Sequence, residues 1–230
     1  MAEFVLSPDA AAIQAFVKER GITRLVHCTP FCNLLGVYEM GALWAKQKIE
    51  TVAQSKSDFF LLDYIRWNDG LRLDGRRDCI NLSIQRINQY LFTSFKKKFT
   101  ECDIWCILEI SPEILAAEGV SFTVGNAASS YVRNCGTGIG IDALRAMFAD
   151  SVVVGNMYGR RVSTRMGVPN NCPTDRQAEV MFPDEINVKY IQGIVVESEE
   201  HHAMVSRALQ IEYPEMKLPQ VRVCHEDFMS

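Results

Sequence analysis

The sequence lacks the segments that would place the protein in or across a membrane. No apolar run approaches the roughly 20 residues that a transmembrane helix requires. The N-terminal residues, Met1 to Pro8, contain neither the basic stretch nor the apolar core of a secretory signal peptide. We therefore expect a cytoplasmic protein that makes no membrane contact.

The cysteine spacings of zinc sites and redox centres are also missing. The chain contains eight cysteines, but no two of them form a Cys-x-x-Cys pair. Without a secretion signal we expect no disulfide bonds, because the cytoplasm keeps thiols reduced. The cysteines are therefore expected to be packed thiols, since a free cysteine behaves as a small apolar residue. We expect no bound metal.

Two familiar nucleotide-binding motifs are absent as well. There is no P-loop, and no Gly-x-Gly-x-x-Gly follows a predicted strand. The Gly-x-Gly-x-Gly of residues 136–140 lacks the strand–turn–helix context of a Rossmann dinucleotide site. These absences argue against the P-loop and Rossmann classes of nucleotide-binding protein.

The chain has no overall excess of positive charge, which argues against a strongly basic nucleic-acid binder. Its 24 lysines and arginines and 28 aspartates and glutamates give a net charge of −4. The charge is uneven, because residues 125–178 contain six arginines and three aspartates but no lysine or glutamate. Arginine suits phosphate groups and stacks on bases. This segment therefore fits either a nucleic-acid contact or a solvated basic loop.

The hydrophobic pattern and the length of 230 residues predict one mixed α+β domain over residues 1–230. Strands are expected over residues 22–29, 79–84, 103–110, 178–182, 190–196 and 221–224. Helices are expected over residues 8–20, 33–40, 87–95, 112–117, 142–148 and 199–210. Residues 119–173 are rich in glycine and arginine, and we expect a long irregular segment there. In a compact domain such a segment is a binding loop or is disordered.

Three local groups of polar residues are candidates for chemistry. His27 and Thr29 alternate on a predicted buried strand and so point the same way; they fit a ligand site or a core histidine satisfied by backbone. Ser83 on the strand 79–84 is weak evidence by itself. Gln177 and Glu179 share one face at the start of a strand, directly after the arginine-rich segment. A carboxylate there could stabilise a developing cation or remove a proton, or it could be an ordinary surface glutamate.

The order of these groups along the chain is similar to the layout of ADP-ribosyltransferases: a histidine strand, a serine strand and a final Gln-x-Glu strand. The reaction explains the need for a carboxylate, because cleaving the nicotinamide bond of NAD leaves positive charge on the ribose carbon. A carboxylate beside that ribose stabilises the oxocarbenium-like state, much as it does in glycosidases. NAD is therefore the expected co-substrate.

Longer motifs resemble the DarT family of toxin ADP-ribosyltransferases, which modify DNA bases. They cover roughly residues 22–225, and the most specific one is Pro173-Thr-Asp-x-Gln-Ala-Glu-Val180. The others include His27-Cys-Thr-x-x-x-Asn-Leu34, Asn68-Asp-x-x-Arg-Leu-Asp74, Asn81-Leu-Ser-Ile84 and Asn126-Ala-Ala128. The resemblance implies an ADP-ribosyltransferase-like split mixed β-sheet core with flanking helices and a substrate loop at about residues 125–178.

The resemblance also implies roles for individual residues. The residues expected to bind NAD are His27, Cys28, Thr29, Gly36 and Leu43. Glu179 is the expected catalytic glutamate, and Arg72 is the expected catalytic arginine. Arg66 is its alternative, because the loop length there leaves the alignment open. The residues expected to bind the substrate are Gln177, Arg160, Arg161 and Arg165. Arg176 stands where the family often has proline, and it adds a positive charge beside the glutamate.

The expected partners are single-stranded DNA and an antitoxin protein, in a toxin–antitoxin or phage-defence system. The residues themselves leave other targets open. RNA is the main alternative, because nothing local distinguishes the two sugars, and a protein target is a weaker one. A catalytically inactive module that binds NAD or nucleic acid is the alternative from another class. The presence of both an arginine candidate and Glu179 argues against it.

Overall fold

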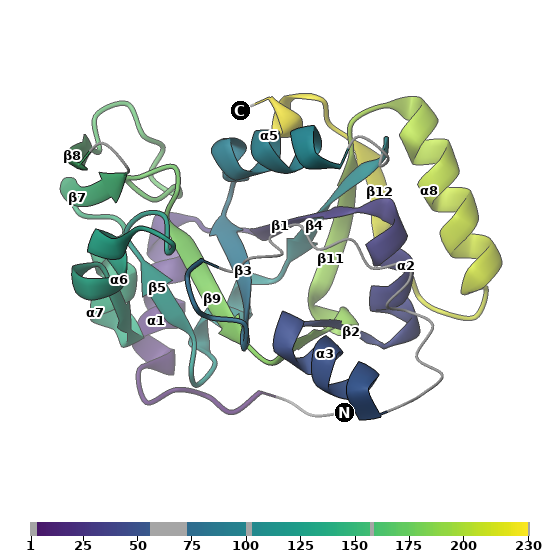
Figure 1. The fold of residues 1–230 in the computed structure, drawn as a ribbon, viewed down its shortest axis with the longest axis horizontal. Coiled ribbons are helices and arrows are strands. Elements are labelled where there is room, and N and C mark those ends of the chain that lie inside the picture. The colour runs from purple at the N-terminus through teal and green to yellow at the C-terminus, as the bar shows by residue number, and fades with distance from the viewer. Residues whose placement is uncertain (1–3, 56–72, 100–102, 157–158, 230) are drawn as a thin grey trace.

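The computed structural model describes residues 4–55, 73–99, 103–156 and 159–229. An eight-stranded sheet crosses the molecule in the order β12-β11-β4-β1-β3-β9-β5-β6 (Figure 1). Its strands are β1 (Leu25–Pro30), β3 (Cys79–Ile84), β4 (Trp105–Ile110), β5 (Ser121–Thr123), β6 (Thr137–Ile139), β9 (Glu179–Pro183), β11 (Ile191–Val196) and β12 (Gln220–Val223). All neighbours in it pair antiparallel except β11 and β12, which are parallel.

Two strand pairs lie outside this sheet. The first joins β2 (Ala42–Trp44) to β10 (Glu185–Asn187), and the second is the hairpin of β7 (Ser151–Asn156) and β8 (Gly159–Thr164). Helices and strands are thus mixed along the chain, and the predicted α+β class is confirmed.

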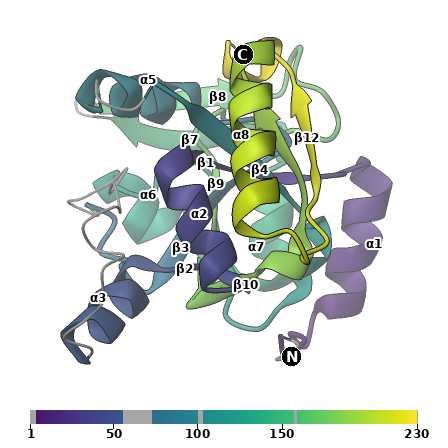
Figure 2. The ribbon, with the colours of Figure 1, turned by 90° about the vertical axis from the view of Figure 1, so that its right-hand side faces the viewer.

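Helices cover both faces of the sheet (Figures 1 and 2). The main core forms on one face, where the helices are α1 (Ala10–Arg20), α2 (Phe31–Glu39), α7 (Gly140–Ala146) and α8 (Glu199–Glu212). The other face is covered by α5 (Gln89–Lys98) and the 3-10 turn Glu226–Phe228. The other helical segments among the described residues are α3 (Lys46–Ser55), α6 (Ser130–Cys135), and the 3-10 turns Pro112–Ala116 and Val188–Tyr190.

Strand β4 shows why the sequence builds a sheet that is covered on both faces. Successive side chains of a strand point to opposite faces. Trp105 and Ile107 pack in the cluster with Phe92 of α5, whereas Leu108 and Ile110 pack in the main core. Because both sets are apolar, each face needs a helical layer. Burying one such side chain contributes about 1.5–3 kcal/mol.

The N-terminal helix was predicted within two residues of its observed start, and its end was predicted correctly. It ends because Gly21 adopts a left-handed conformation, with φ of 67°, and donates its N–H to the last turn. At its start, Asp9 makes no side-chain cap. Its carboxylate instead accepts a hydrogen bond from the Ile141 N–H, at 3.0 Å, and so ties α1 to α7.

The helix predicted at residues 142–148 is found as α7, but the prediction that the rest of residues 119–173 is irregular is wrong. The elements that the sequence did not predict there are β5, α6, β6, β7 and β8. Strands β5 and β6, with three residues each, and helix α6, with six, are too short to show a strand or helical period, and they are formed by packing against distant residues. At Gly125, for example, an added Cβ would lie 2.6 Å from Val154 Cγ1, so glycine lets the hairpin approach. The three-residue strands β2 and β10 were missed for the same reason.

The sheet opens between β1 and β3. Strand β1 pairs with β4 along its whole length, from Leu25 to Pro30. With β3 it pairs at Leu25 and Val26, opposite Ile84 and Ser83. Beyond Val26 the two strands part, and the predicted split of the sheet lies at this place. The split exposes the ends of strands that would otherwise be covered by their neighbours.

Candidate active site

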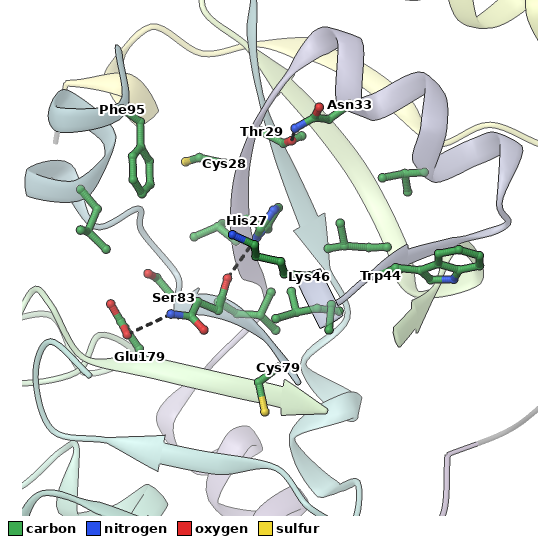
Figure 3. Close-up of a pocket in the computed structure, with 18 of the residues that line it drawn as sticks. His27, Cys28, Thr29, Asn33, Trp44, Lys46, Cys79, Ser83, Phe95 and Glu179 are labelled. Atoms are coloured by element: carbon green, nitrogen blue, oxygen red, sulfur yellow. Dashed lines mark hydrogen bonds between the residues drawn. The ribbon is translucent and has the colours of Figure 1, made fainter. Parts of the chain in front are cut away.

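A pocket occupies the split in the sheet, and its walls come from distant parts of the chain. Strand β1 contributes His27, Cys28 and Thr29, and β9 contributes Glu179 on the opposite side. Figure 3 shows these side chains around one cavity, with Lys46 of α3 and Phe95 of α5 also directed toward it. Gly36 and Leu43, also expected to bind NAD, line the same cavity. The pocket therefore unites the two motifs that the sequence singled out.

The imidazole of His27 is held by the backbone of β3. Its Nδ1 lies 3.0 Å from the carbonyl oxygen of Asn81. A carbonyl can only accept, so Nδ1 carries the hydrogen and donates it. The acceptor site of the neutral ring is then Nε2. The two interpretations of this histidine thus combine, because backbone satisfies one nitrogen while the ring lines a pocket.

The two residues after His27 shape the wall without reactive groups of their own. Thr29 is buried, and its Oγ1 accepts a hydrogen bond from Asn33 Nδ2 at 3.1 Å. This bond joins β1 to the first turn of α2. Burial raises the pKa of the Cys28 thiol well above its usual range. Cys28 is therefore neutral at physiological pH and is not a nucleophile.

Glu179 begins β9 and is only 3% exposed. Its Oε2 accepts hydrogen bonds from Asn81 Nδ2 at 3.3 Å and from the Ala127 N–H at 3.4 Å. Its own N–H donates to Thr123 Oγ1 at 3.2 Å. The alternative that Glu179 is an ordinary surface glutamate is thereby excluded. The carboxylate is buried, oriented by two N–H donors and directed into the pocket (Figure 3).

Asn81 connects the two sides of the pocket. Its carbonyl oxygen holds His27, and its Nδ2 reaches both Glu179 and, at 3.2 Å, Asp74 Oδ2. One residue of the central strand β3 therefore positions the histidine of β1 and the glutamate of β9. It belongs to the Asn81-Leu-Ser-Ile84 motif, but that motif did not indicate a role for it. Ser83, from the same motif, lines the pocket.

The Pro-Thr-Asp motif before Glu179 builds the turn that aims it. Thr174 and Asp175 are buried, although both are polar. Thr174 Oγ1 donates to the Ala149 carbonyl at 2.6 Å. Asp175 Oδ1 accepts the Gln177 N–H at 2.9 Å, and its other oxygen accepts Arg161 Nη2 at 2.7 Å. The most specific motif of the sequence therefore acts through folding, since its polar side chains fix the backbone entering β9.

The four residues expected to bind substrate lie around this turn. Gln177 Oε1 accepts a hydrogen bond from Asn126 Nδ2 at 3.4 Å. Arg161 is bound to Asp175, whereas Arg160 lies over the ring of Tyr131, at 4.6 Å from its centroid.

Arg165 makes four hydrogen bonds within its own segment. Three go to the carbonyls of Pro169, Asn170 and Cys172, and one goes to Thr174 Oγ1. Its guanidinium therefore holds this loop together, and its contact with substrate stays a prediction. Arg72 and Arg66 lie outside the described residues, so the choice between them also stays a prediction.

Several residues that shape the site were not assigned a role from the sequence. They are Asn81, the Ala127 N–H, Thr123 and Lys46. The motif Asn126-Ala-Ala128 includes Ala127, but it did not indicate that the Ala127 N–H donates to Glu179. No sequence feature indicated that Lys46 lies at the site, because it follows a three-residue strand that the hydrophobic pattern does not reveal.

Among the described residues there is no group of three or more His, Cys, Asp or Glu side chains that could hold a metal ion. None of the helices in this part of the chain is both long and apolar enough to cross a bilayer.

Known proteins resemble this chain in sequence profile and in fold. Residues 26–228 match the profile of a family described as DarT, ssDNA thymidine ADP-ribosyltransferase. That match covers far more than half of the chain. No curated protein sequence matches the chain significantly.

Solved structures of similar fold include Thermus sp. 2.9 DarT in complex with NAD+, at 16% identity and a TM-score of 0.58. The match covers 90% of this chain and 97% of that one. The same Thermus protein in complex with ADP-ribosylated ssDNA gives a TM-score of 0.55, also at 16% identity and the same coverage. Thermosipho africanus DarTG in complex with ADP-ribose matches with a TM-score of 0.51 and 16% identity, over 90% of this chain and 51% of that one. At these identities the likeness concerns the fold.

Proposed function

The chain belongs to the DarT family of ssDNA thymidine ADP-ribosyltransferases, and from this premise we propose that it transfers ADP-ribose from NAD to a thymine of single-stranded DNA. Nicotinamide is the other product. The observation that carries the proposal is the buried carboxylate of Glu179, which faces His27 across one pocket. A pocket that joins these two motifs suits a reaction at the ribose of NAD.

The residues that line the pocket fit NAD by their chemistry. Trp44 and Phe95 offer aromatic surface for the rings of the dinucleotide, and His27 offers a hydrogen-bonding ring. Among the described residues that line the pocket, Lys46 is the one with a permanent positive charge, and its side chain is 12% exposed. It would face the diphosphate, which carries two negative charges. Lys46 reaches Glu50 Oε1 at 4.0 Å, which keeps it on this side of α3.

The chemistry follows from the position of Glu179. Cleavage of the bond between nicotinamide and the ribose carbon leaves positive charge on the sugar, and nicotinamide departs as a neutral molecule. A carboxylate held beside the ribose stabilises that charge more than it stabilises the ground state. The N–H donors of Asn81 and Ala127 fix the orientation of the carboxylate before the reaction begins. No reorganisation is then needed at the moment of bond cleavage.

The acceptor must be a ring nitrogen that is not already bonded to sugar. In thymidine, N1 carries the deoxyribose, so N3 is the nitrogen available, and it carries a proton. As the bond from N3 to the ribose carbon forms, that proton must leave to a base, for which Glu179 is the carboxylate at hand. In a duplex N3 is paired and stacked, which explains why a single strand is the substrate.

We assign the arginine-rich segment to the DNA, with Arg160 and Arg161 on the hairpin as its exposed cations. We also propose that the protein acts in the cytoplasm as the toxin of a pair with an antitoxin. Support comes from the match to DarTG, of which this chain spans about half. A role in phage defence would follow from such a pair. Co-expression with such an antitoxin should restore the growth of cells that the protein alone arrests.

The test is transfer of labelled ADP-ribose from NAD to oligonucleotides. Matched single-stranded DNA and RNA oligomers should be compared, together with a DNA oligomer in which every thymine is replaced by cytosine. The proposal predicts one added ADP-ribose on thymine-containing DNA and none on the other two. Label on RNA alone would move the target to transcripts, whereas label on cytosine DNA would refute thymine as the acceptor.

A further inference from the structure

A second hollow lies beside the active-site pocket, between α5 and the turn before β9. We call it the α5 groove and define it by Arg86, Tyr90, Thr93, Ser94, Lys97 and Arg176, which line it. Ile87 lines both the α5 groove and the active-site pocket. The two spaces therefore adjoin, and Arg176 stands three residues before Glu179.

The groove is built from one face of α5. Tyr90, Thr93, Ser94 and Lys97 follow the spacing of three, four and seven residues that brings side chains together on a helix. The helix is fixed at its start, where the side chain of Asn88 accepts the Leu91 N–H. On its other side Lys96 pairs with Glu197 at 3.0 Å and lies over the Phe92 ring. Helix α5 therefore directs one polar face toward the groove and packs against the sheet with another.

The opposite wall is set by the turn that aims Glu179. Asp175 is buried because Arg161 and the Gln177 N–H hold its carboxylate inward. The next residue, Arg176, is exposed and lines the groove. The turn thus places one charged side chain inward for structure and the next outward toward the groove.

The residues that line the groove are complementary in charge and hydrogen bonding to a phosphodiester strand. Three lining residues are cations, namely Arg86, Lys97 and Arg176, and no carboxylate lines the groove among the described residues. The Nη2 atom of Arg86 is buried and has no hydrogen-bond partner in the described part of the chain. Thr93 and Ser94 add hydroxyl donors. Tyr90 is 68% exposed, and its ring offers a surface on which a base can stack.

We infer that the α5 groove binds the single-stranded DNA that flanks the thymine undergoing reaction. The cations neutralise its phosphates and Tyr90 stacks on one flanking base, which positions the strand without reading its sequence. This inference rests on the proposed function, because the strand enters the groove from the active-site pocket. It adds a second contact region to the hairpin, on the other side of the turn that carries Glu179.

The inference is tested with two single-stranded DNA oligomers, a tetranucleotide and a dodecanucleotide, each with one thymine. Binding is measured by fluorescence anisotropy without NAD over a range of salt, and transfer is measured with NAD. The variants are Tyr90→Ala and Lys97→Ala, both at exposed positions, and the matched control is Lys96→Ala on the other face of the helix. Melting temperatures confirm that each variant is folded.

For the dodecanucleotide, Tyr90→Ala should weaken binding about fivefold or more, the lower end of the loss of one stacked base. Lys97→Ala should reduce the slope of log K against log salt by about 0.7, the value for one phosphate contact on a single strand. In both variants the ratio of kcat/KM for the long oligomer over the short one should fall, whereas Lys96→Ala should keep the parent ratio.

The inference is refuted if both variants keep the affinity, salt slope and length ratio of the parent. It is also refuted if they weaken binding and transfer equally for the two oligomers. The groove would then be free for another partner, such as an acidic protein. If the parent protein transfers ADP-ribose to neither oligomer, the proposed function fails instead. The anisotropy measurement needs no NAD, so these failures are distinguishable.

Discussion

Replacement of Asn81 tests whether one residue of β3 positions the catalytic carboxylate. Its side chain donates to Glu179 Oε2 at 3.3 Å, while its backbone carbonyl holds His27. A substitution therefore removes the contact to the glutamate and leaves the contact to the histidine. Asn81→Ala removes the donor, and Asn81→Asp replaces it with a carboxylate of the same shape. The two variants separate the loss of a hydrogen bond from the addition of charge.

The distances set the expected magnitudes. A hydrogen bond to a charged group contributes about 1.5–3 kcal/mol, and 3.3 Å lies just beyond the usual range. The lower value then applies, and Asn81→Ala should lower kcat about tenfold. In Asn81→Asp the new carboxylate would face both Glu179 and Asp74. Each pair of like charges about 4 Å apart costs about 4 kcal/mol at an effective dielectric constant of about 20. That variant should lose roughly a further hundredfold or more, because the site cannot keep these carboxylates all charged and close.

The assay is steady-state transfer to a thymine oligomer, with kcat and the KM for NAD determined separately. A positioning role predicts that kcat falls while the KM for NAD changes little, because the contact acts on the reacting centre. Lowering the pH should recover part of the activity of Asn81→Asp, since a proton removes one of these charges. Equal rates for the two variants, or an alanine variant within about twofold of the parent, would refute the reasoning.

Three further outcomes follow from the structure. Asp175→Ala should lower transfer about tenfold or more, because the turn that aims Glu179 loses its buried anchor; binding of NAD, measured by calorimetry, should change far less. Burial alone would raise the pKa of Asp227, but hydrogen bonds from Arg24 hold it below its usual value. The stability that this adds is complete above the ordinary carboxyl pKa of about 4 and is lost as the pH falls further; Arg24→Met should flatten that acid loss in urea unfolding. Phe122→Ala should cost about 3–5 kcal/mol in the same assay, because its ring is 1% exposed in the main core.

Long strands were predictable because each carries its own signal. Strands β1, β4 and β11 have six residues each, and each lies in a mainly apolar stretch of the sequence. Between residues 119 and 173, β5 and β6 have three residues each, and both depend on partners far along the chain. Strand β6, for example, is three residues long and pairs with β5 through Gly138 and Phe122. No local pattern predicts such a pairing.

Site residues could be predicted where they belong to a recognisable motif. They could not be predicted where only the folded chain brings them to the pocket. His27 and Glu179 were found because each sits in a recognisable motif, and both line the pocket. The burial of Glu179 was not predictable, because Thr123 and Ala127, which contact it, lie more than fifty residues earlier. The tasks of Asn81 and Lys46 likewise depend on which strands and helices meet at the split in the sheet.

The proposed reaction depends most directly on the charge of Glu179, and one measurement tests this dependence. Under single-turnover conditions, the parent and Glu179→Gln are mixed with NAD and a thymine-containing single strand, and the modified DNA is followed by mass. Glutamine keeps the shape and loses the charge, so we predict NAD binding close to that of the parent and a rate lower by about 10²–10³ or more. A Glu179→Gln variant that binds NAD and transfers ADP-ribose near the parent rate would contradict the assignment of this carboxylate.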